Sequence, residues 1–229
     1  EHLPEVECVG RTARYPASVS HGEICYIEEK LFYAEPDLFR IFDFTFIKGD
    51  PKNGINAPNT AFLSQSAAIR YFGTENPIGK SISIDKKTEY QVTGIFEDMP
   101  QNSHIKMDIV VPWANLLKIF GDDFDGSWGD SGAYTYLLFA EGADIPAFQK
   151  KIDDIAMKEF GEILKNYKLT MTLPIQKLAD IHLTSHYQQE FETNGDKTSI
   201  DILLIVAIFI IVIAWVNYIN LSTAQSLTR

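Results

Sequence analysis

Residues 202–216 are Ile-Leu-Leu-Ile-Val-Ala-Ile-Phe-Ile-Ile-Val-Ile-Ala-Trp-Val, an uninterrupted apolar run near the end of a chain of 229 residues. Continued to Leu221, the segment has 20 residues, or about 30 Å of helix, which matches the hydrocarbon core of a bilayer. Trp215 and Tyr218 lie toward one end, where interfacial aromatic residues are found. The alternative, a buried core helix, rarely has every face apolar in a chain of this size. We therefore predict a transmembrane helix within residues 199–229.

The flanking sequence suggests a fragment of a longer membrane protein. Residues 1–8 contain neither the basic nor the apolar region of a signal peptide, and the chain ends soon after the apolar run. The positive-inside rule leaves the orientation open, because Lys197 lies on one side of the run and Arg229 on the other.

The composition excludes several classes of protein. The net charge is −11, from 20 Lys and Arg against 31 Asp and Glu, with no basic cluster, so we expect no nucleic-acid partner. Aromatic residues make up 12% of the chain, which argues against intrinsic disorder. Cys8 and Cys25 are too few for a disulfide framework. They form either one bridge in an oxidising compartment or two free thiols.

Residues 1–198 predict a mixture of strands and helices. Ser64–Phe72 begins with a capping serine and stops at Gly73. Asp144–Tyr167 has a capping aspartate and a proline in its first turn, and a third helix is expected over Pro112–Phe120. Segments rich in β-branched and aromatic residues, or alternating with period two, predict strands at Glu23–Ala34, Thr60–Ser64, Ser81–Asp85, Tyr90–Phe96, Asp108–Val111, Tyr134–Ala140 and Leu169–Leu173.

The order of these elements favours an α+β fold, because strands occur on both sides of the helices rather than in strict alternation. We expect one domain of two subdomains over residues 1–198, with residues 101–180 as an inserted lobe. Residues 199–229 contain the membrane helix.

Residues 73–81, Gly-Thr-Glu-Asn-Pro-Ile-Gly-Lys-Ser, resemble a phosphate-binding loop but fail two of its requirements. Five residues rather than four separate the two glycines. A helix precedes the loop and a strand follows it, so helix N-terminal amides cannot face a phosphate. The segment predicts a helix stop at Gly73 and a turn into a strand.

His182 and His186 are four residues apart and, with Glu190, could bind zinc from one face of a helix. The composition of Ile181–Ser185 is strand-like, however, and in a strand residues at that spacing are about 13 Å apart. We therefore expect a surface or boundary role rather than a metal site.

The acidic segment Gly121–Asp130 resembles a calcium-binding loop. Two positions that need oxygen ligands in such a loop are occupied by glycines, Gly121 and Gly132. The segment therefore favours a solvated turn over a calcium site. No nucleophile elbow or cysteine-protease signature is present in the sequence. We predict no catalytic, cofactor-binding or metal-binding residue and no cofactor.

Several segments resemble, in order, a MacB-type periplasmic core domain. Leu31–Phe39 is followed by Phe42-Asp-Phe44 and Lys48-Gly49-Asp50. The most specific signature is a strand, a helix ending in Phe-Gly, an Asn-Pro-x-Gly-Lys turn and a Val-x-Gly strand, found at Thr60–Ser64, Ala67–Gly73, Asn76–Lys80 and Tyr90–Phe96. Leu178–Leu183 resembles the segment that returns toward the membrane, and Asn217–Ala224 resembles the opening of an FtsX-like permease region. The resemblance covers most of residues 30–229 and is loose before residue 30.

This resemblance implies a non-catalytic permease subunit of an ABC transporter in the bacterial inner membrane. Residues 1–198 would lie in the periplasm and Arg229 near the cytoplasmic face. The implied partners are a cytoplasmic ABC ATPase, a second permease copy or fused half, the lipid bilayer, and a periplasmic adaptor or substrate. The periplasmic domain would couple the ATPase cycle to export or extraction of substrate.

Two other functions remain open from the sequence. One is a cell-envelope regulator that transmits a conformational signal without transporting a substrate, and the other is a membrane-anchored enzyme. Asn217 and Asn220 lie on one face of the predicted membrane helix, and we expect them to contact neighbouring helices because polar side chains seek partners in lipid.

Overall fold

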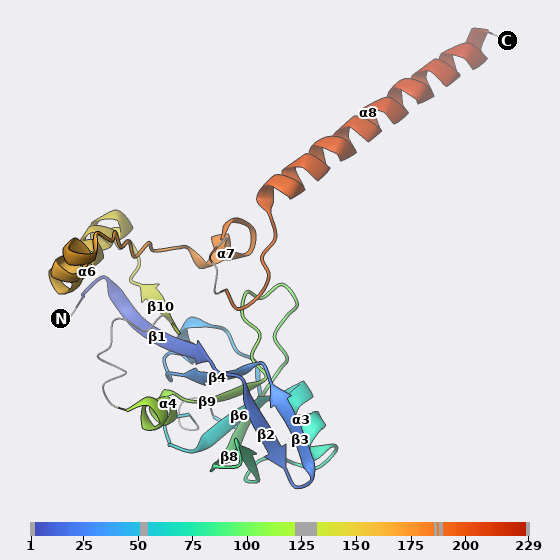
Figure 1. The fold of residues 1–229 in the computed structure, drawn as a ribbon. Helices are drawn as coiled ribbons and strands as arrows, with labels where there is room; N and C mark the ends of the chain where they lie inside the picture. Colours follow the sequence, from blue (N-terminus) through green and yellow to red (C-terminus); the bar gives the residue numbers. More distant parts are fainter. Residues whose placement is uncertain (1–2, 51–54, 122–131, 186, 188–189, 228–229) are drawn as a thin grey trace. The chain divides into compact units, whose positions relative to one another are not determined.

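The computed structural model describes residues 3–50, 55–121, 132–185, 187 and 190–227 (Figure 1). Its strands are β1 (Val6–Arg14), β2 (Ala17–His21), β3 (Ile24–Glu28), β4 (Leu31–Ala34), β5 (Phe46–Lys48), β6 (Thr60–Ser64), β7 (Ser81–Ile84), β8 (Thr88–Phe96), β9 (Ile109–Pro112) and β10 (Ala133–Phe139). Its helices are α1 (Leu38–Ile41), α3 (Gln65–Phe72), α4 (Trp113–Phe120), α6 (Ile145–Tyr167), α7 (Leu178–Thr184) and α8 (Lys197–Leu227).

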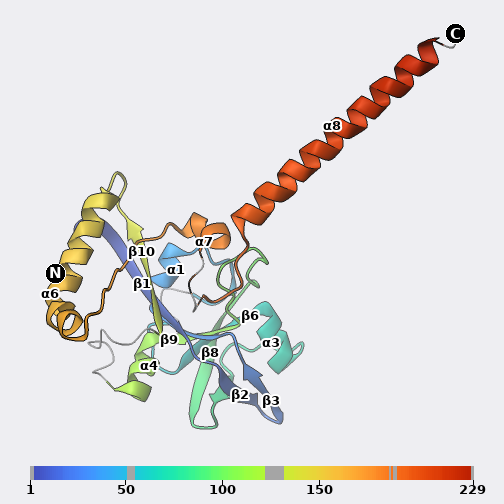
Figure 2. The same ribbon diagram turned by 45° about the horizontal axis from the view of Figure 1, so that its top comes forward.

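The strands form one mixed sheet in the order β10-β1-β4-β9-β6-β8-β7-β2-β3, and β5 pairs with β8. The pairs β4–β9 and β6–β8 are parallel, and the other pairs are antiparallel. Helices and strands do not alternate regularly, so the predicted α+β class is confirmed. β3 and β10 form the two edges of the sheet (Figures 1 and 2).

The central strand β6 is buried along its whole length, because both faces of the sheet are covered there. Ala61 and Leu63 face a core that includes side chains of α3 and α4. Phe62, on the opposite face, packs against the rings of Phe39 and Phe46, at centroid distances of 5.7 and 5.5 Å. Alternate residues of one strand therefore contribute to two separate cores.

The Val-x-Gly strand has a packing role. Gly94 on β8 pairs with Phe62 on β6, next to an irregularity in the register of the two strands. A Cβ atom at Gly94 would lie 1.9 Å from Cε1 of Phe62, so only glycine leaves room for that ring. The ring is fully buried.

The predicted helices are confirmed at both ends. The Ser64 hydroxyl accepts a hydrogen bond from the amide of Ala67 and caps α3, which ends at Gly73 with φ of 60°. Asp144 caps α6 in the same way, accepting from the amide of Ala147. α4 begins directly after Pro112 and ends at Gly121.

Several strand predictions need correction. The segment Glu23–Ala34 is two strands, β3 and β4, rather than one, because a turn at Glu29 and Lys30 separates them. β1, β2 and β5 were not among the predicted strands. β1 lies between β4 and β10, and β2 lies between β3 and β7.

The strand predicted at Leu169–Leu173 is wrong. α6 ends at Tyr167, the capping residue Lys168 has a left-handed conformation with φ of 53°, and the following segment pairs with no strand of the described part. The Gln149 side chain of α6 instead bonds the carbonyl of Leu173 and the amide of Ile175. Period-two alternation without a neighbouring edge does not form a strand.

The strand-like interpretation of Ile181–Ser185 is also wrong, since most of it lies in α7. The Thr184 hydroxyl donates a hydrogen bond to the carbonyl of Asp180, four residues earlier. A threonine side chain can make this bond within a helix, so a β-branched residue is accommodated there.

The chain divides into two compact units, Glu1–Ile175 and Gln176–Arg229. In the predicted lobe at residues 101–180, β9 and β10 pair with strands from outside it. The boundaries predicted at residues 101, 180 and 198 stay predictions.

Candidate functional site

The segment Gly73–Ser81 has the predicted order of helix, turn and strand. Its backbone amides are used inside the protein: Gly79 donates to the carbonyl of Val92 at 2.8 Å and Lys80 to that of Pro77 at 3.0 Å. The Lys80 ammonium pairs with Glu75. The loop therefore turns the chain from α3 into β7.

The three candidate zinc ligands are only partly described. His182 lies in α7 and is exposed, whereas His186 lies outside the described residues. Glu190 accepts a hydrogen bond from Ser185. In the described part of the chain, no group of three His, Cys, Asp or Glu side chains is placed to hold a metal ion.

The acidic loop is almost entirely outside the described residues. Gly121 ends α4, with φ of 89°, and residues 122–131 are not described. Gly132, at the other end, is described.

The two cysteines are free thiols, so the disulfide alternative is wrong. Cys8 is buried on β1, where burial raises the pKa of its thiol, and its Sγ lies 3.6 Å from the carbonyl oxygen of Asp37. Cys25 is exposed on β3, with Sγ 3.4 Å from the Ser18 hydroxyl. β1 and β3 are not neighbours in the sheet.

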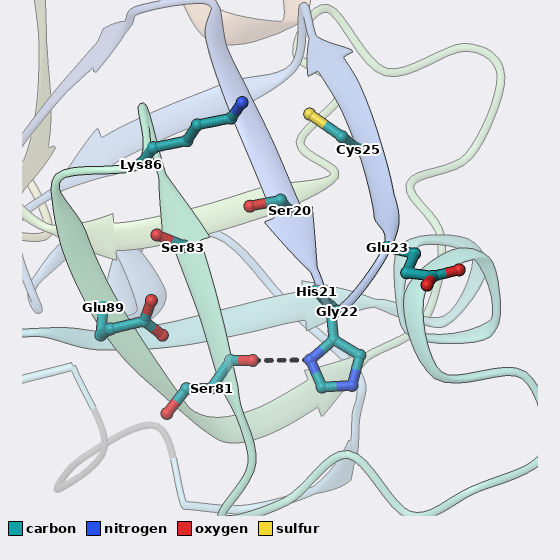
Figure 3. Close-up of a pocket in the computed structure, with 9 residues that line it drawn as sticks. All are labelled: Ser20, His21, Gly22, Glu23, Cys25, Ser81, Ser83, Lys86 and Glu89. Atoms are coloured by element: carbon teal, nitrogen blue, oxygen red, sulfur yellow. Dashed lines mark hydrogen bonds between the residues drawn. The ribbon is translucent and has the colours of Figure 1, made fainter.

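A shallow hollow of about 550 Å³ lies on the outer face of β2, β3, β7 and β8 (Figure 3). Its floor follows one row of register partners across the four strands: Cys25, Ser20, Ser83 and Glu89. Three of these four side chains are small, while neighbours on the inner face, such as Val19 and Ile82, are buried in the core. This end of the sheet therefore has one polar face and one apolar face.

The rim of the hollow carries charges of both signs. Lys86 lies on one side, and Glu23 lies at the turn between β2 and β3 (Figure 3). His21 is held in place by a hydrogen bond between its Nδ1 and the carbonyl of Ser81, 2.9 Å long, and its ring packs on Phe72. This mixture suits a peptide or another polar ligand better than a strongly charged one.

A buried polar network ties the edge strand β3 to α3. The Tyr71 hydroxyl donates to Oε1 of Glu28 at 2.6 Å, and Nε of Arg70 lies 3.2 Å from the same oxygen. Arg70 also donates to Asp108, just before β9, at 3.0 Å. The guanidinium therefore links an edge strand to the centre of the sheet, and the buried carboxylate of Glu28 has two partners.

Two buried tyrosines make the stability sensitive to alkaline pH. Burial raises the pKa of Tyr33 and Tyr71 above the ordinary value of about 10, and at Tyr71 the hydrogen bond to Glu28 adds to the effect. Above pH 10 the unfolded chain releases these protons while the folded chain retains them, so their stabilisation is lost as the pH rises.

We expect the free energy of unfolding to fall by about 1.4 kcal/mol per tyrosine between pH 9 and pH 11, as measured by urea unfolding. In the Tyr33→Phe variant, the fall in the free energy of unfolding between the two pH values should be smaller by about 1.4 kcal/mol, because one of the two titrating tyrosines is gone. Equal stability of the wild-type protein at the two pH values would contradict this expectation.

α8 is long and apolar. By length and composition, its residues Lys197–Thr223 could cross a membrane, and the mean hydropathy of an 18-residue stretch within them reaches 2.9. It is the one such helix in the described part of the chain, at the predicted place. Thr223 donates its hydroxyl to the carbonyl of Ile219 within the helix, whereas Asn217 and Asn220 lie exposed on its surface.

Comparison with protein families adds a match over most of the chain. The model of the MacB-like periplasmic core domain matches residues 1–155. The match includes residues 1–29, where the resemblance found in the sequence alone was loose; these residues form β1, β2 and β3. No curated protein matches the chain.

The solved structures that share this fold include the following three. A domain from Porphyromonas gingivalis, described as part of a permease, is 21% identical with a TM-score of 0.60, covering 69% of this chain and 72% of its own. The periplasmic region of MacB from Actinobacillus actinomycetemcomitans is 14% identical, with a TM-score of 0.55. The match covers 74% of this chain and 79% of the MacB structure. The extracellular domain of the noncanonic ABC-type transporter YknZ from Gram-positive bacteria is 15% identical, with a TM-score of 0.52. The match covers 69% of this chain and 78% of the YknZ structure.

Proposed function

Because the chain belongs to the family of MacB-like periplasmic core domains, we propose that it is part of a non-catalytic permease subunit of an ABC transporter. Its domain, residues 1–198, lies in the periplasm, and its membrane helix, within residues 199–229, crosses the inner membrane. The observation that carries this proposal is the combination, in one chain, of a domain of this family with a helix long and apolar enough to span a bilayer.

The energy source in this proposal is a separate cytoplasmic ATPase. The one glycine-containing segment that resembles a phosphate loop is a turn whose amides bond within the protein. ATP hydrolysis would move the membrane helices, and α8 would pass that movement to the periplasmic domain. The domain would in turn act on a substrate or an adaptor at the cell envelope.

A second permease copy or fused half completes the assembly, and α8 offers a place for contact. An amide in the hydrocarbon region gains by bonding to another helix, at about 1 kcal/mol per interhelical bond. We expect the Asn217→Leu/Asn220→Leu double variant to weaken the detergent-extracted complex, measured as earlier subunit dissociation on dilution. The matched control is Ile208→Leu/Ile211→Leu, which has the same spacing on the opposite face. Equal dissociation of the two double variants would contradict the expected role of the asparagines.

The proposal is tested on the full-length parent protein, extracted from native membranes in mild detergent. We expect an ABC ATPase subunit to co-purify in a fixed ratio and the preparation to hydrolyse ATP. A preparation without a partner and without hydrolysis would reject the transporter assignment and favour a stand-alone membrane-anchored module.

A further inference from the structure

The strand β3 has an edge that no other described strand covers. It lies at the end of the sheet and pairs with β2 alone. His21 and Ile24 close the hairpin around Gly22, whose φ is 57°, and Glu23. In a hairpin with a two-residue loop the closing pair is hydrogen-bonded, and bonded pairs then alternate along the strands. The N–H and C=O groups of Cys25 and Ile27 therefore point away from β2.

The side chains of β3 do not protect this edge. Natural edge strands usually carry Lys, Pro or an inward-pointing charge that discourages pairing. Here Tyr26 and Ile27 are 49% and 67% exposed. The one charged residue within the strand, Glu28, does point inward, but its buried carboxylate is bonded to Tyr71 and paired with Arg70, so its charge is already compensated inside the domain. The edge therefore combines free backbone groups with exposed apolar side chains, the combination used for binding an added strand.

Charges at the two ends of β3 restrict what can pair with it. Glu23 precedes the strand and Glu29 follows it, both exposed and six residues apart. If β3 of a second copy added antiparallel with full overlap, Glu23 of each copy would face Glu29 of the other. Like charges directly opposite each other destabilise a strand pair. A second copy is therefore a poor occupant, and a strand with cations at these two positions is a good one.

We propose that the free edge of β3 binds an extended segment of a partner protein, which adds as an antiparallel strand and carries Lys or Arg at two positions six residues apart, opposite Glu23 and Glu29. The backbone groups of Cys25 and Ile27 supply the hydrogen bonds of the new pairing. The small side chains of Cys25 and Ser20, which lie side by side in the hollow of Figure 3, leave space for a side chain of the added strand. This surface extends the proposed function by defining the partner's chemistry.

The test uses the full chain in detergent and two synthetic peptides, Lys-Val-Thr-Val-Thr-Val-Lys and the same peptide with Glu at both ends. We expect the lysine peptide to bind about tenfold more tightly in a calorimetric titration, because two opposite-charge pairs replace two like-charge pairs. Bound lysine peptide should slow amide hydrogen exchange at Cys25 and Ile27. The Glu23→Lys/Glu29→Lys variant should prefer the glutamate peptide.

A lysine peptide that is N-methylated on the amides facing β3 should lose binding, and this control leaves the protein unchanged. Equal affinity for the two peptides, or a charge-reversal variant with unchanged preference, would overturn the proposal. So would a dimer of the chain that Ile27→Lys dissociates, since β3 would then pair with a second copy. These readouts do not involve ATP, so they can fail while the ATPase subunit still co-purifies.

Discussion

Replacing Gly94 with alanine is expected to lower the free energy of unfolding by about 3 kcal/mol. The added methyl group would lie 1.9 Å from Cε1 and 2.0 Å from Cδ1 of Phe62, well inside van der Waals contact. Phe62 cannot move aside easily, because its buried ring is packed between Phe39 and Phe46. The strain must therefore separate β6 from β8 or displace the aromatic cluster.

The measurement is denaturant unfolding of the chain in detergent, followed by tryptophan fluorescence. Gly161→Ala is the matched control: Gly161 lies within α6 and has only the end of Met157 nearby, at 4.0 Å. That change should stabilise by about 0.5–1 kcal/mol, because alanine favours a helix more than glycine does. Adding Phe62→Leu to Gly94→Ala should recover part of the loss. If Gly94→Ala is as stable as the wild type, the close packing of β8 on Phe62 is wrong.

Replacing Arg70 with methionine is expected to cost about 3 kcal/mol, the second large effect. The substitution keeps much of the side-chain volume but removes the cation from Glu28, whose side chain is 4% exposed. An uncompensated buried carboxylate is costly, because it has lost its hydration. The cost stays at the low end of the range for buried pairs, since Arg70 is itself 32% exposed and Tyr71 still donates to Glu28.

A double-mutant cycle separates the charge effect from lost packing. Glu28→Gln in the Arg70→Met background should restore part of the stability, because a neutral amide is less costly to bury. Lys80→Met, which breaks the exposed pair with Glu75, should change the stability by no more than about 0.5 kcal/mol. If Arg70→Met and Lys80→Met lowered the free energy of unfolding equally, the buried network would contribute no more to stability than an exposed ion pair does.

Local signals predicted the helices well. α3 and α6 each have a capping side chain before the first turn, and α3 also has a glycine after its last residue, so short-range chemistry defines their ends. The strands depended more on distant partners. Leu169–Leu173 alternates like a strand yet finds no edge, while β1 and β2 form because β10, β4, β3 and β7 flank them. Apart from the β2–β3 hairpin, these pairings join residues that are far apart in the sequence, which a local pattern cannot reveal.

The candidate surface was less predictable than the fold. Cys25, Ser20, Ser83 and Glu89 form one row only because their strands pair in a particular register. Likewise, Arg70 meets Glu28 and Asp108 through tertiary contacts over about forty residues. In contrast, the apolar run in α8 and the Asn-Pro-x-Gly-Lys turn are each continuous in the chain, so the amino-acid sequence by itself indicates a membrane helix and the family.

The most direct test of the account is the accessibility of Cys25 in the parent protein, expressed in cells that are then converted to spheroplasts. Cys25 is exposed and Cys8 is buried, so among the cysteines of residues 1–229 a membrane-impermeant maleimide should label Cys25 and not Cys8, and the label assigned to Cys25 by peptide mapping should disappear in Cys25→Ser. A second reporter, Gln225→Cys in the Cys25→Ser background, lies beyond the candidate span that ends at Thr223. We predict labelling of Cys25 in intact spheroplasts and of the residue-225 cysteine only after lysis. Labelling of Cys25 only after lysis would place the domain in the cytoplasm and contradict the account.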